Sequence, residues 1–115
     1  MIHRIFLVAF WFTLVFAFVM ALLPHPPMVP GAPTDKVQHI AAFATLTALG
    51  RAAFRDMPPL RLLAYLAAFG ALIEIMQAMP ALRRSSDIID WIADVASVLI
   101  TLGVVAALRL GLRYD

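Results

Sequence analysis

Ten polar or charged residues that could bind a ligand or move a proton lie in three short stretches of a largely apolar chain. Carboxylate and imidazole groups can orient a bound molecule by hydrogen bonds or act as acids and bases, and guanidinium groups can hold an anion. The candidate ligand-binding residues are Asp35, Lys36, His39, Glu74, Gln77, Arg83, Arg84, Asp87, Asp90 and Asp94. Whether they form one site depends on how the segments between them fold.

Within each stretch, the spacing is that of neighbours on one helix face, three or four residues apart. The pairs are Asp35 with His39 and Glu74 with Gln77, and the longer stripe is Asp87, Asp90 and Asp94. If these stretches are helical, each therefore presents its polar groups in one direction.

The composition around these residues is typical of a membrane protein. The chain has 115 residues, is 63% hydrophobic and 14% charged, and contains no cysteine. So little charge argues against a soluble enzyme, and the scattered basic residues form no stripe that would bind nucleic acid. Four apolar segments, at 5–23, 37–54, 62–79 and 88–108, are about long enough to cross a bilayer as helices. The predicted fold is all-α, an integral membrane antiparallel four-helix bundle forming a single domain over 1–115.

Prolines and basic residues predict the connections and the orientation. A Pro-rich stretch at 24–33 predicts an extended loop, Pro58 and Pro59 separate the second and third segments, and Pro80 ends the third. The side that carries both termini holds six basic residues, against three on the other side: Arg4, Arg51, Arg55, Arg61, Arg109 and Arg113 against Lys36, Arg83 and Arg84. This predicts cytoplasmic termini. The first segment is predicted to be a retained helix, because no A-x-A cleavage site follows it.

Depth in the bilayer distinguishes two of the acids. At about 1.5 Å per residue, Glu74 and Asp94 lie roughly 9 Å inside the outer ends of their helices. A carboxylate at the centre of a membrane helix costs roughly 2.5–3.5 kcal/mol, so intramembrane acids usually face the protein interior and have a partner.

Structural roles are the alternative for every candidate. Asp87 and Asp35 could cap their helices, and Asp90 could interact with the helix dipole. Lys36, Arg83 and Arg84 could contact lipid headgroups, and His39 could be an ordinary interfacial histidine. For Glu74 and Asp94 the alternative is a polar contact that holds the third and fourth helices together.

Three stretches resemble the VanZ-like family of small membrane proteins. Residues 35–43 (DKVQHIAAF) resemble its D-K-x-x-H-x-x-x-[FY] signature, and 74–77 (EIMQ) resemble its E-x-x-Q. Residues 84–94 (RSSDIIDWIAD) resemble its R-x-x-[DS]-x-x-D-x-x-A-[ND], with Asp94 where asparagine is commoner. The resemblance implies a four-helix protein of the bacterial cytoplasmic membrane and a link to teicoplanin-type glycopeptide susceptibility, without naming a reaction.

Several functions fit these observations. The first is a polar outer-leaflet site for an anionic or lipid-linked envelope molecule, held by Arg83 or Arg84 and oriented by His39, Glu74 and Asp94. The second is an enzyme at the same site, in which His39 and a neighbouring carboxylate could act as acid and base, and His39, Glu74 and Asp94 could bind a divalent metal. This signal is weak, because H-E-x-x-H and G-x-S-x-G are absent, and the sequence assigns no metal ligand and leaves the cofactor unknown. The third is a non-catalytic accessory subunit of a larger membrane complex, with membrane lipid and other subunits as partners. A proton-coupled transporter is the least favoured.

Overall fold

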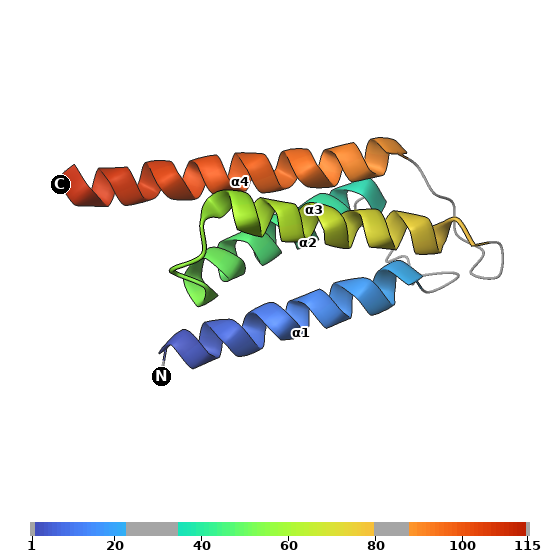
Figure 1. Ribbon diagram of the computed structural model, residues 1–115, viewed down its shortest axis with the longest axis horizontal. Coiled ribbons are helices and arrows are strands. Elements are labelled where there is room, and N and C mark those ends of the chain that lie inside the picture. Colours follow the sequence, from blue (N-terminus) through green and yellow to red (C-terminus); the bar gives the residue numbers. More distant parts are fainter. Residues whose placement is uncertain (1, 23–34, 80–87, 115) are drawn as a thin grey trace.

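Four α-helices make up the regular structure of the part of the chain that the structure describes. The computed structural model describes residues 2–22, 35–79 and 88–114. In these ranges the helices are α1 (Ile2–Leu22), α2 (Asp35–Ala53), α3 (Pro59–Gln77) and α4 (Ile88–Tyr114), shown in Figure 1. The prediction of an all-helical chain with four helices at these places is confirmed.

Three of the four predicted spans are long and apolar enough to cross a membrane. They are Ile2–Leu22, Pro59–Gln77 and the Ile88–Arg109 part of α4. Helix α2 is not among them, because its polar residues, which include Lys36, Gln38, His39 and Arg51, lower its mean hydropathy.

The boundary between α2 and α3 lies where the prolines predict it. Pro58 has an extended backbone, with φ −60° and ψ 142°, and Pro59 begins α3. Proline has no amide hydrogen to donate, so it is well tolerated in the first turn of a helix. The predicted extended loop at 24–33, the end of the third segment at Pro80 and the proposed cap Asp87 lie outside the described residues.

The helices pack around α2. It has extensive contacts with α1 and α4, and α3 packs mainly on α4. The first residues of α1 and the last residues of α4 lie at the same end of the molecule (Figure 1). A Cβ atom added to Gly50 would lie 3.0 Å from Leu62 Cδ1 and 3.3 Å from Phe10 Cε2, so this glycine permits close contact between helices.

Apolar side chains fill the interior and also cover the outside. Phe43, Leu46, Leu66, Ile73 and Val98 are fully buried. Large apolar residues are exposed on every helix, and on α1 these include Ile5, Val8, Phe12, Val15 and Phe16. An apolar surface this extensive is abnormal for a soluble monomer.

Candidate functional site

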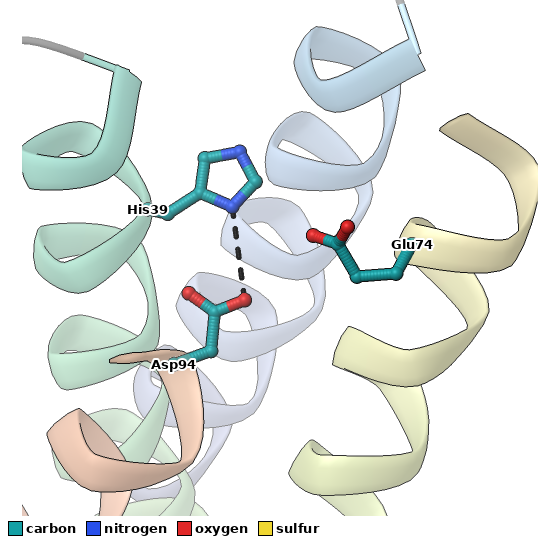
Figure 2. A group of neighbouring side chains, drawn as sticks. All are labelled: His39, Glu74 and Asp94. Carbon is teal, nitrogen blue, oxygen red and sulfur yellow. Dashed lines mark ion pairs between the residues drawn. The ribbon is translucent and has the colours of Figure 1, made fainter. Parts of the chain in front are cut away.

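Three of the predicted site residues meet in the interior, each from a different helix. His39 comes from α2, Glu74 from α3 and Asp94 from α4. Figure 2 shows their side chains pointing toward one another in the space between these helices. One ligand-capable atom from each residue lies within 4.8 Å of the other two. We call this group the polar triad.

The triad is almost closed to the surroundings. The Asp94 side chain is 1% exposed and that of His39 is 16% exposed, and Glu74 is 7% exposed. Burying a carboxylate costs free energy unless a charge, a hydrogen bond or a proton compensates it. His39 is the least buried member of the triad.

Asp94 lacks the hydrogen bonds that a buried carboxylate normally accepts. Neither of its oxygens has a hydrogen-bond partner among the described residues, and neither does Nδ1 of His39. The nearest approach is that of His39 Nδ1 to Asp94 Oδ2, at 3.7 Å, which is longer than a hydrogen bond. The two groups face one another at ion-pair distance, marked by the dashed line in Figure 2.

Two hydrogen bonds between helices fix the position of Asp94. Trp91 Nε1, three residues before it, donates to the Ala67 carbonyl of α3 at 2.9 Å. Ser97 Oγ, three residues after it, donates to the Ile40 carbonyl of α2 at 2.9 Å. Since Ile40 follows His39 in the chain, the second bond also sets the distance between the two facing side chains.

Gly70 makes room for Asp94. It precedes Glu74 by one helical turn, and a Cβ atom there would lie 3.6 Å from Asp94 Oδ2. The same atom would lie 3.3 Å from both Phe43 Cζ and Trp91 Cδ1. A larger residue would therefore push α4 away from α3 at the triad.

Gln77 makes a structural contact. Its side chain is 2% exposed, and its Nε2 donates to the Ala21 carbonyl of α1 at 2.8 Å. The bond ties the end of α3 to the end of α1. The Gln77 amide nitrogen is therefore engaged with α1.

For the remaining predicted site residues, the structure gives at most a position on a helix. Asp90 is half-buried in the first turn of α4, one turn before Asp94. Asp35 and Lys36 lie in the first turn of α2. Arg83, Arg84 and Asp87 lie outside the described residues, so the predicted anion site at the entry to α4 has no structural description.

Arginines gather at the other end of the bundle. Arg51, near the end of α2, donates to the Met57 carbonyl at 2.9 Å. Arg109 donates to the Arg51 carbonyl at 3.4 Å. Exposed Arg55 and Arg61 lie near the turn between α2 and α3. The triad and these basic groups therefore occupy opposite ends of α2 and α4.

Sequence reasoning missed the residues that support the triad. Gly70, Trp91 and Ser97 were not among the candidates, and each sits one helical turn from Glu74 or Asp94. That spacing was visible in the sequence. Their role became evident only when the neighbouring helices were placed.

Comparison with known proteins does not assign the chain to a family. Neither protein-family models, curated proteins nor solved structures give a match to the sequence or the fold. The VanZ-like resemblance of the three motifs therefore stays a prediction.

Proposed function

We propose that this chain is a VanZ-like integral membrane protein of the bacterial cell envelope with a polar outer-leaflet site, built around the polar triad, for an anionic or lipid-linked envelope molecule. The triad is the observation that carries the proposal. His39, Glu74 and Asp94 come together from three helices inside an apolar bundle. Polar groups at membrane depth are costly, and where they occur they commonly serve binding or transport.

The membrane setting is supported by the distribution of polarity. The outside of α1 and α4 carries large apolar side chains such as Phe12 and Ile100, whereas Asp94 and Gln77 are buried. Three helices meet the length and composition needed for crossing. We infer an antiparallel four-helix bundle in which α2, despite its charged first turn, crosses with the others and is shielded by α1 and α4.

The arginine-rich end of the bundle indicates how the protein is oriented in the membrane. Arg51 and Arg109 lie together there, and cytoplasmic loops are enriched in basic residues. We therefore assign this end and both termini to the cytoplasm, which puts the triad near the outer leaflet. Arg83 and Arg84 would supply positive charge for a phosphate, while the triad would orient nearby hydroxyl or amide groups.

The decisive experiment is lipid analysis of protein extracted in a lipid-preserving polymer. Wild type is compared with a Glu74→Gln, Asp94→Asn variant, which removes the acidic groups with little change in size. A control carries Ile75→Leu and Ile92→Leu, two exposed neighbours of the site residues. We expect wild type and control to retain the same anionic or lipid-linked species, and the variant to lose most of it.

Identical lipid profiles for all three proteins would refute the lipid-site proposal. If the variant also co-purifies with a large assembly as wild type does, the accessory-subunit alternative becomes the better account. A companion assay expresses the same proteins in a bacterium without an outer membrane. Wild type is expected to lower teicoplanin susceptibility, and the Glu74→Gln, Asp94→Asn variant is expected not to.

Labelling of single cysteines tests the orientation, since the natural chain has no cysteine. Val37, Met79 and Ile88 are exposed near the triad end, and Leu60 is exposed near the basic end. A membrane-impermeant maleimide should label Val37→Cys, Met79→Cys and Ile88→Cys in intact cells, and Leu60→Cys only after permeabilisation. Label on Val37→Cys but not on Ile88→Cys would put the two halves of the site on opposite sides of the membrane.

A further inference from the structure

We propose that His39, Glu74 and Asp94 form a binding site for a divalent transition-metal ion such as zinc. The inference rests on the described side chains alone and does not depend on the lipid ligand proposed above. One imidazole and two carboxylates are a ligand set that zinc and neighbouring metals accept.

The spacing of the three groups fits a shared ion. Two ligands bound at roughly 2.1 Å to one tetrahedral ion lie about 3.4 Å apart. His39 Nδ1 and Asp94 Oδ2 are 3.7 Å apart, too far for a hydrogen bond but close to this value. The Glu74 oxygen completes a set whose members lie within 4.8 Å of one another, so binding one ion would draw this carboxylate slightly closer to the other two groups.

Asp94 supplies an independent sign that something is bound. Its carboxylate is 1% exposed, points into the triad (Figure 2) and receives no hydrogen bond from the described residues at either oxygen. Buried polar atoms nearly always have a partner. The buried hydroxyls of Thr47 and Ser97, by contrast, bond to main-chain carbonyls.

Charge favours a cation over an anion at this position. Two carboxylates and a neutral imidazole carry a formal charge of −2, which a divalent ion cancels. An isolated carboxylate in a low-dielectric interior is strongly disfavoured. The opposed helices hold the ligands in place, because the Trp91 and Ser97 hydrogen bonds on either side of Asp94 join α4 to α3 and α2.

An ion held by three protein ligands keeps at least one coordination position open. Water or an oxygen of a bound phosphate can occupy it. This last step, unlike the ion site itself, rests on the proposed function, since it would let the acidic triad hold an anionic headgroup.

The test uses the full chain in nanodiscs of zwitterionic phosphatidylcholine, so that no anionic lipid is needed. The protein is stripped with a chelator and titrated with Zn²⁺ in competition with a chromophoric chelator. We expect one Zn²⁺ per chain. We also expect Co²⁺ to give the intense visible absorption of a four- or five-coordinate site.

Variants distinguish specific metal binding by the triad from non-specific attraction of a cation to negative charge. Since loss of an outer-shell partner alone typically costs 10–100-fold in metal affinity, Asp94→Asn, Glu74→Gln and His39→Gln should each weaken Zn²⁺ binding at least about 10-fold. Glu74→His keeps a ligating atom and should bind more tightly than Glu74→Gln. His3→Gln alters an exposed histidine remote from the triad and should bind as wild type does. Circular dichroism and gel filtration of each variant confirm that the fold is kept.

Absence of stoichiometric Zn²⁺, Co²⁺ or Mn²⁺ binding by folded wild type would overturn the inference. Equal affinity of wild type and Asp94→Asn would overturn it as well. If wild type binds zinc but retains no anionic or lipid-linked species, the ion site is supported and the lipid proposal is rejected.

Discussion

Gly70 offers a direct test of how α3 and α4 approach one another at the triad. A Cβ atom at this position would lie 3.3 Å from Phe43 Cζ and from Trp91 Cδ1, and 3.6 Å from Asp94 Oδ2. Gly103, in α4, is the matched control because a Cβ atom there meets nothing within 4 Å. The test replaces each of the two glycines by alanine and, separately, by leucine.

The expected free energies of unfolding follow from these distances. Alanine in place of a helical glycine gains up to about 1 kcal/mol. At Gly70 neighbours must move by a few tenths of an ångström, a cost of about 1 kcal/mol that cancels this gain. Leucine at Gly70 adds atoms for which the interior has no room and should destabilise by about 3 kcal/mol. Both substitutions at Gly103 should stay within about 1 kcal/mol of wild type.

Unfolding in mixed micelles of a mild detergent and SDS, followed by circular dichroism, gives these energies. Zinc affinity is a second readout, since leucine at Gly70 would displace Asp94 and should weaken binding at least about 10-fold. If Gly70→Leu and Gly103→Leu have the same stability within about 0.5 kcal/mol, the described contact between α3 and α4 is wrong.

Two further pairs of substitutions, each a test and its control, probe the packing of the helices by the same unfolding assay. Ser97→Ala removes the hydrogen bond to the Ile40 carbonyl and should cost about 0.6 kcal/mol, the average for such bonds between membrane helices. Thr45→Ala, whose hydroxyl bonds only within its own helix, should have a smaller effect, and equal losses would contradict the interhelical role of Ser97. Leu66→Ala leaves a cavity at a residue that is 1% exposed and should cost about 2 kcal/mol or more. Leu72→Ala, at a residue that is 46% exposed, should cost much less, and a reversed order would put the interior on another face of α3.

The helices were predictable because their signals are local. Long apolar runs and the prolines between them fixed the four segments, and Pro58 and Pro59 marked the turn between α2 and α3. The end of α4 was less accurate: the helix was expected to end at residue 108, but it continues to Tyr114. The apolar run stops before Arg109, yet arginine and leucine favour helix, so the helix outlasts the hydrophobic segment.

The triad was predictable in part. The depth of Glu74 and Asp94 in apolar sequence singled them out, and His39 was a candidate beside them. Their convergence depends on how each helix is rotated about its axis, and this is a property of the packed helices together. Gln77 illustrates how close spacing on a helix differs from a shared direction of the side chains. Residues three apart on a helix differ in direction by about 60°, so Glu74 can face α2 and α4 while Gln77 reaches the Ala21 carbonyl of α1.

The pattern of hydrogen bonding in the interior explains why Asp94 is central to both proposals. In lipid, a polar group can be satisfied only by the protein, by trapped water or by a ligand. The buried side chains of Thr47, Ser97 and Gln77 each bond to a main-chain carbonyl. Asp94 cannot do this, because an ionised carboxylate only accepts hydrogen bonds and helix carbonyls offer no donor. A buried carboxylate among helices therefore requires a proton or a cation. Since two helices hold Asp94 in place, the ion or molecule that satisfies it defines what this site does.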